Sequence, residues 1–146
     1  MSATLDWTLE QIRQHIAEGL PLVPLFNLEV VEATASRGRV RLNAGEHVSR
    51  PGGAVAGPVL FALADVVTYA LILAARPDPD AVTVDLTINF LRPARRLPLL
   101  AEAVPLRGGR RLFTAEVRIV EEGGGGELVA QAMTTWSLSR SAAWRG

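Results

Sequence analysis

The chain has 146 residues, of which 49% are hydrophobic and 21% charged, a composition typical of one globular domain and not of a disordered protein. Its 15 basic and 15 acidic residues give a formal net charge of zero, so no net field draws the protein to nucleic acid or to an acidic membrane. The absence of cysteine excludes disulfides and thiolate metal sites, and the absence of lysine excludes lysine Schiff-base chemistry.

The first segment predicts a helix over residues 5–19. Leu9, Ile12 and Ile16 recur at helical spacing, and a glycine and a proline then end the pattern. His15 lies on this helix and is expected to face solvent. The segment lacks the basic stretch followed by an apolar stretch that marks a signal peptide, so we expect a cytoplasmic protein.

Residues 26–32 and 37–43 follow as the two strands of a predicted hairpin. In the second strand, Val40 and Leu42 alternate with polar residues, which gives one apolar and one polar face. A loop rich in glycine and containing a proline then leads to the most apolar part of the chain.

Residues 54–75 carry a single charge, that of Asp65. A stretch of this length could span a bilayer, but the charge lies near its middle and the rest of the chain resembles a soluble sheet protein. A helix that is apolar on all sides is also typical of a fully buried core helix, and we favour that interpretation. We expect the helix to begin near Gly57, with Pro58 in its first turn, and to end before residue 76.

Four further strands are predicted, over residues 82–90, 99–106, 113–119 and 128–136, with glycine-rich turns between the last three. Pro105 indicates an edge or a bulge in the second of them. The clearest alternation belongs to the first, where the apolar face carries Val82, Val84, Leu86, Ile88 and Phe90, and the polar face carries Thr83, Asp85, Thr87 and Asn89.

This order predicts an α+β fold in which one antiparallel sheet wraps around a long central helix, with a short N-terminal helix beside it. An antiparallel sheet of this size has one face to bury, and only the helix is apolar enough to fill it. We expect one domain over residues 1–146, with its core in residues 25–138 and a frayed tail in residues 139–146.

Several local strings accompany this order. Residues 50–58 read RPGGAVAGP, and Leu63-Ala64-Asp65 follows inside the helix. Residues 81–94 read AVTVDLTINFLRPA, and the last strand reads LVAQAMTTW. Together these strings resemble the phenylacetate-type branch of the hot-dog thioesterase superfamily, over most of the predicted domain.

The resemblance implies a hot-dog fold, hydrolysis of an acyl-CoA thioester to CoA and a carboxylic acid, and Asp65 as general base or nucleophile. It also implies that residue 50 and the amide of Gly57 polarise the thioester carbonyl. The chain departs from the family pattern where Arg50, Ala56 and Pro58 replace the usual asparagine, histidine and second glycine. Either Arg50 acts as a charged donor, or the site has become one that binds acyl-CoA without hydrolysis. A hydratase of this fold would need a histidine paired with the acid, and Ala56 disfavours it.

Asp65 is also the candidate that physical chemistry selects. A carboxylate on an apolar helix is costly unless it is paired, and burial should raise its pKa toward the range of a general base. A structural aspartate bonded to Thr68 or to a neighbouring strand is the alternative. Thr68 either orients this carboxylate or bonds its own helix backbone.

Gly57 and Pro58 at the helix start offer free N–H groups and a positive helix end, which suit an oxyanion.

Gly57 and Asp65 lie roughly 12 Å apart along one helix, so they cannot both touch one carbonyl. If two copies of the helix run antiparallel across a two-fold axis, the start of one meets the aspartate of the other. The resemblance likewise implies two shared sites per dimer. We therefore expect a homodimer, and a dimer of dimers as the larger assembly.

The remaining candidates concern the substrate. Arginine forks suit the phosphates of CoA, and Arg92, Arg95 and Arg96 cluster after a strand end, with solvated surface arginines as the alternative. Candidates for substrate contact are Ala56, Pro58, Asn89 and Phe90, and candidates for the acyl pocket are Phe61, Tyr69 and Leu73. No cofactor is expected, and the two histidines, His15 and His47, lack the carboxylate spacing of a metal site.

Overall fold

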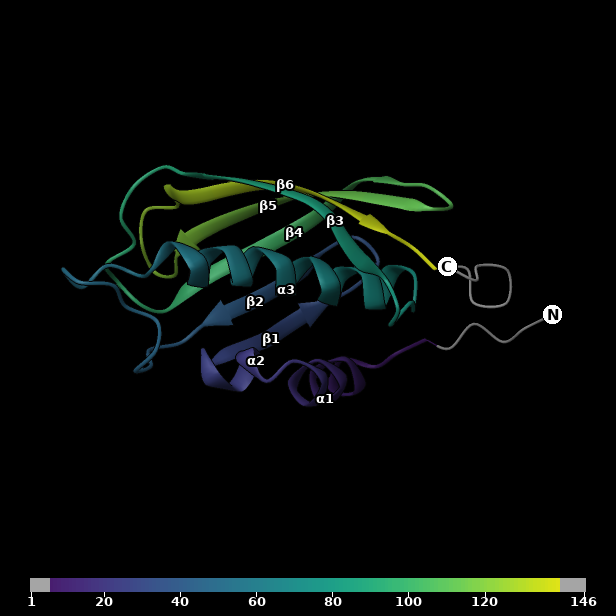
Figure 1. Cartoon of the computed structure of the whole chain (residues 1–146), viewed down its shortest axis with the longest axis horizontal. Coiled ribbons are helices and arrows are strands. Elements are labelled where there is room, and N and C mark those ends of the chain that lie inside the picture. Colours follow the sequence, from purple (N-terminus) through teal and green to yellow (C-terminus); the bar gives the residue numbers. More distant parts are fainter. Residues whose placement is uncertain (1–5, 140–146) are drawn as a thin grey trace.

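The computed structural model describes residues 6–139 and shows a six-stranded antiparallel sheet wrapped around one long helix (Figure 1). The strand order across the sheet is β1-β2-β4-β5-β6-β3. The predicted α+β hot-dog architecture is confirmed. In chain order the elements are α1 (Leu9–Gly19), α2 (Leu22–Leu25), β1 (Leu28–Ala33), β2 (Gly38–Leu42), α3 (Gly57–Ala75), β3 (Val82–Phe90), β4 (Leu99–Gly108), β5 (Leu112–Glu121) and β6 (Leu128–Ser137).

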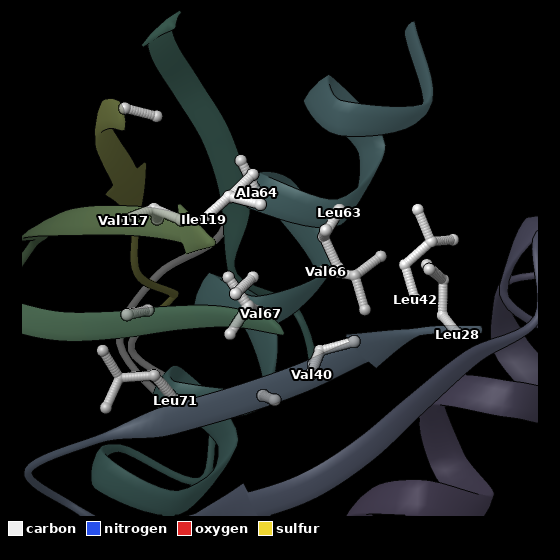
Figure 2. Packing of buried hydrophobic residues seen from close by; sticks show 14 of the residues in the cluster. Leu28, Val40, Leu42, Leu63, Ala64, Val66, Val67, Leu71, Val117 and Ile119 are labelled. Carbon is white, nitrogen blue, oxygen red and sulfur yellow. The ribbon is translucent and has the colours of Figure 1, made fainter. Parts of the chain in front are cut away.

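α3 fills the concave face of the sheet. Leu63, Val67 and Leu71 of the helix pack in one cluster with Val40 of β2 and Ile119 of β5, and all five are fully buried (Figure 2). Burying side chains of this size stabilises the fold by about 1.5–3 kcal/mol each. The helix is also long and apolar enough to cross a membrane, but 61% of its most apolar window is buried inside the protein. This burial is what the sequence predicted for a core helix.

α1 begins later than the predicted residue 5 because Thr8 caps it. The Thr8 hydroxyl accepts from the Gln11 N–H, while the Gln11 side chain accepts from the Thr8 N–H. This reciprocal pair of hydrogen bonds is a capping box and sets the start of the helix. The single turn α2 was not predicted. Residue 5 and the predicted tail in residues 140–146 lie outside the described part of the chain.

The bulge predicted at Pro105 is present in β4. The pairing of β4 with β5 shifts register between Pro105 and Arg107. On its other side β4 pairs with β2 only over residues 99–103, so the missing N–H of the proline interrupts no ladder there.

β3 forms one edge of the sheet, and its alternation differs from the prediction. Leu86 packs against the core as expected, but Val82 and Val84, predicted on the same face, are 55% and 60% exposed. The register of β3 against β6 shifts between Thr83 and Asp85, and such a bulge reverses the alternation. Thr83 therefore shares the helix-facing side of the sheet with Leu86, although the sequence placed it on the polar side.

Candidate active site

Asp65 lies on the one face of α3 that the sheet leaves partly uncovered. Its Oδ1 accepts a hydrogen bond of 2.6 Å from the hydroxyl of Thr83 in β3. The neighbouring helix residues Ala64 and Val66 are buried in the core. The carboxylate thus sits at the boundary between the apolar interior and the open surface.

Burial raises the pKa of the Asp65 carboxyl above its ordinary value, and the hydrogen bond from Thr83 lowers the same pKa in part. Removal from water disfavours the charged form, whereas a donor stabilises it. The net shift is in the direction that the apolar setting predicts for a general base.

Thr83, and not Thr68, supplies the hydrogen bond that orients Asp65. The Thr68 hydroxyl is buried and donates to the carbonyl of Ala64 at 3.0 Å, which was the alternative role predicted for it. Thr83 reaches the carboxylate because the bulge in β3 places it opposite Trp136 of β6, whose ring is buried on the helix-facing side. Thr83 is the site residue that sequence reasoning missed.

Replacing Thr83 with valine is expected to raise the pKa of Asp65 further, because the change removes a donor that stabilises the carboxylate. Loss of a hydrogen bond to a charged group should also destabilise the fold by about 1 kcal/mol at neutral pH. The carboxyl carbon of Asp65, followed by NMR through a pH titration, measures the pKa. Thr83→Ser keeps the hydroxyl and should titrate like the wild type. An unchanged pKa in Thr83→Val would contradict the role given to this hydrogen bond.

The start of α3 presents one free amide. Val59 and Leu60 both donate to the carbonyl of Ala56, and Pro58 has no N–H. Within residues 6–139, the N–H of Gly57 has no acceptor. A methyl group added at Gly57 would touch the ring of Phe90 at 3.5 Å, so an apolar wall lies beside this donor. A free amide at a helix start is suited to an oxyanion.

Arginines gather around this helix start. Arg50 and Arg92 line a groove of about 400 Å³ together with Gly57 and Phe90. Arg92 is partly neutralised by ion pairs with Glu121 and Glu127, at 3.8 and 3.2 Å. Within residues 6–139, Arg50 has no carboxylate within 4.0 Å. The groove, which we call the arginine groove, is therefore positively charged at its rim.

The other predicted substrate residues lie at varied distances from this groove. Arg95 is close, since its guanidinium donates to the carbonyl of Gly52 at 3.2 Å, and Arg96 is exposed beside it. Asn89 instead bonds the side chain of Gln131 on the neighbouring strand. His47 is exposed in the loop before the groove.

A second cavity, the α1 pocket, opens beside Asp65. It measures about 300 Å³ and is lined by His15, Gly19, Leu20, Asp65, Tyr69, Ala81, Val82, Thr83 and Trp136. The expectation that His15 faces solvent is wrong, because its Nε2 lies 2.9 Å from the Tyr69 hydroxyl and its ring is half-buried. Leu73 is fully buried in the core and lines neither cavity, so its predicted place in an acyl pocket is also wrong.

Within one chain, Gly57 and Asp65 belong to different cavities, the first to the arginine groove and the second to the α1 pocket. The rise of the helix keeps them roughly 12 Å apart. Over residues 6–139, no group of three His, Cys, Asp or Glu side chains converges as metal ligands would. The arrangement offers a base with a raised pKa and a separate oxyanion donor.

Comparison with known proteins shows the family of this chain. The family model described as the thioesterase superfamily matches residues 52–136, more than half of the chain, and this range contains Gly57, Asp65 and Thr83. The chain belongs to the thioesterase superfamily. The resemblance to hot-dog thioesterases is thereby confirmed, and the phenylacetate-type branch stays a prediction. Membership supports a hydrolase of thioester or ester bonds.

Individual relatives agree with the family. A Saccharolobus solfataricus protein named "Putative esterase SSO1253" is 30% identical over 102 residues, which cover 70% of this chain and 67% of that protein. The zebra fish thioesterase superfamily member 2 has a TM-score of 0.79 at 26% identity, covering 92% of this chain and 100% of its own. Thioesterase HI1161 of Haemophilus influenzae has a TM-score of 0.80 over 91% of each chain, and at 22% identity it shows the fold alone.

Proposed function

We propose that this protein hydrolyses acyl-CoA thioesters at two equivalent sites, each shared between two copies of the chain. In each site the Gly57 amide of one protomer holds the thioester carbonyl, and the partner's Asp65 acts on it. The observation that supports the proposal is that α3 and β3 both expose apolar side chains where one two-fold axis could bury them.

The uncovered stripe of α3 supports an axis at Phe61. This stripe carries Pro58, Phe61, Asp65 and Tyr69 at about one-turn spacing, and Phe61 is 43% exposed although it is a large apolar residue. Two such helices packed antiparallel with Phe61 at the crossing point bring residue 57 of one beside residue 65 of the other. An exposed aromatic residue at the centre is what such a contact would bury.

The edge strand β3 supports the same axis. It is nine residues long with Leu86 at its centre, and Val82, Val84 and Phe90 expose apolar surface. A long apolar edge strand is a template for pairing with a second copy. Antiparallel pairing about Leu86 is consistent with the helix contact, because Gly57 lies against Phe90 while Asp65 lies against Thr83. Phe61 lies between these two contacts along α3, as Leu86 lies between them along β3, which supports one common axis.

The resulting site can perform the hydrolysis in two ways. The carboxylate of Asp65 can take a proton from water, whose oxygen attacks the thioester carbonyl carbon. Alternatively the carboxylate attacks that carbon itself, and water then opens the resulting anhydride. In both routes the Gly57 amide stabilises the negative charge on the carbonyl oxygen, and the C–S bond breaks to release CoA as thiolate, which takes up a proton. The hydroxyl of Thr83 keeps the carboxylate oriented.

The arginine groove is suited to the phosphates of CoA, and Arg95 beside it offers a test. Arg95→Ala is expected to raise KM for an acyl-CoA roughly five- to tenfold with kcat little changed, because one charge-assisted hydrogen bond is lost. The same acyl group on N-acetylcysteamine lacks the phosphates and should show no change. Arg118→Ala, on the exposed polar face of β5, is the matched control. Equal effects on both substrates would contradict this assignment.

Release of free thiol from a panel of acyl-CoA thioesters tests the proposed function. Turnover that disappears in Asp65→Asn supports it. A second candidate, an acyl-CoA-binding protein without hydrolytic activity, is favoured by Arg50 and Ala56, which differ from the family pattern. Tight binding of acyl-CoA with no thiol release would establish that candidate and overturn the first.

A further inference from the structure

The two cavities of the site differ in chemical character. The arginine groove carries Arg50 and Arg92 beside the Gly57 amide. The α1 pocket instead lies near acidic residues, since the negative charges of Asp80 and Asp78 add to burial in raising the pKa of the Tyr69 hydroxyl. Polyphosphate is attracted to the first cavity and repelled from the second.

The inner wall of the α1 pocket is apolar. Tyr69 of α3 and Trp136 of β6 stack with ring centroids 5.6 Å apart and planes 8° from parallel. The Tyr69 hydroxyl donates to the carbonyl of Pro79 at 2.8 Å, so it accepts from Nε2 of His15. The indole N–H of Trp136 donates to the hydroxyl of Thr134. Because these polar atoms already have partners, the stacked rings present apolar surface to a ligand.

The outer wall of the α1 pocket is the end of α1. Gly19 is the last residue of this helix and Leu20 caps it, and both line the pocket. A methyl group added at Gly19 would have no atom within 4 Å, so the glycine leaves space that a side chain would fill. The volume of about 300 Å³ corresponds to roughly ten water-sized groups. This is room for a short or medium acyl chain.

We infer that the α1 pocket binds the acyl group of the substrate, and that Gly19 leaves room for a short or medium aliphatic chain while Leu20 limits its length. The inference rests on the proposed function, because it takes the substrate to be an acyl-CoA whose carbonyl lies at Asp65. The CoA arm then lies in the arginine groove of one protomer, and the acyl arm enters the α1 pocket of the partner.

Calorimetric titration with non-hydrolysable acyl-CoA analogues, from acetyl to dodecanoyl, tests the inference. For the wild type, affinity should rise roughly fourfold with each methylene added and stop rising near octanoyl. Gly19→Leu should lower the ratio of octanoyl to acetyl affinity roughly tenfold, because the new side chain occupies the pocket. Leu20→Ala should let the affinity continue to rise for acyl chains longer than octanoyl.

Gly125→Leu is the matched control, because this glycine also has no atom within 4 Å of an added methyl group but lies in the β5–β6 turn. Its affinity profile should match the wild type. A profile unchanged in both Gly19→Leu and Leu20→Ala would overturn the inference, and thiol release by the same proteins would show whether the proposed function still holds. If no analogue binds the wild type, both the acyl-CoA substrate and the acyl pocket are wrong.

Discussion

Replacing Asp65 with asparagine should lower kcat for an acyl-CoA by about a hundred- to ten-thousand-fold, the contribution typical of a positioned general base. Asparagine keeps an oxygen that can accept from Thr83 but can neither take a proton from water nor form an anhydride. Steady-state thiol release measures the loss, and an unchanged circular dichroism spectrum shows that the fold is retained. Activity within tenfold of the wild type would remove Asp65 from the reaction.

The same substitution is expected to stabilise the protein at neutral pH. Folding raises the pKa of the Asp65 carboxyl, mainly through burial. Between the pKa values of the unfolded and folded states, the native protein holds more protons than the unfolded chain, so the free energy of unfolding falls as the pH rises. Above both pKa values, the buried carboxylate is charged and destabilises the fold by its full amount. Thermal unfolding should therefore show a higher Tm for Asp65→Asn at neutral pH, with the difference shrinking as the pH falls from the folded to the unfolded pKa of Asp65. Wild-type activity should likewise require a pH above the raised pKa.

Replacing Gly57 with proline should lower kcat by about a hundred- to a thousand-fold, the effect of removing one oxyanion donor. Proline removes the N–H that is free at the start of α3, and proline is compatible with the first turn of a helix. Gly57→Ala is the matched control, because it keeps the N–H and its methyl group would meet Phe90 at an ordinary 3.5 Å. Equal kcat losses in the two variants would show that side-chain bulk, and not the amide, causes the effect.

The sequence predicted those parts of the fold and site that depend on local pattern. An apolar helix with one acid, followed by alternating strands, indicates a sheet wrapped around a core helix, and α3 with Asp65 confirms this. The free amide of Gly57 also follows from a local signal, since a Gly-Pro pair at a helix start leaves few donors.

Thr83 and His15 show where local pattern fails. The string Thr83-Val84-Asp85 continues a regular alternation, and only the pairing of β3 with β6 introduces the bulge that turns Thr83 toward Asp65. His15 lies on a helix whose polar face looks solvated, but its contact with Tyr69 joins elements 54 residues apart in the chain. Contacts of this kind depend on how the elements pack, so the spacing of residues along the sequence does not predict them.

Mixed dimers test most directly whether each site combines groups from two protomers. Co-expression of Asp65→Asn and Gly57→Pro chains with different affinity tags allows dimers with one copy of each to be purified. If the sites are shared, one site of each mixed dimer pairs an intact Gly57 amide with the partner's intact Asp65, and the other carries both defects. The mixed dimer should then recover about half of the wild-type activity, although both parent dimers are nearly inactive. A mixed dimer no more active than its parents would contradict the shared site.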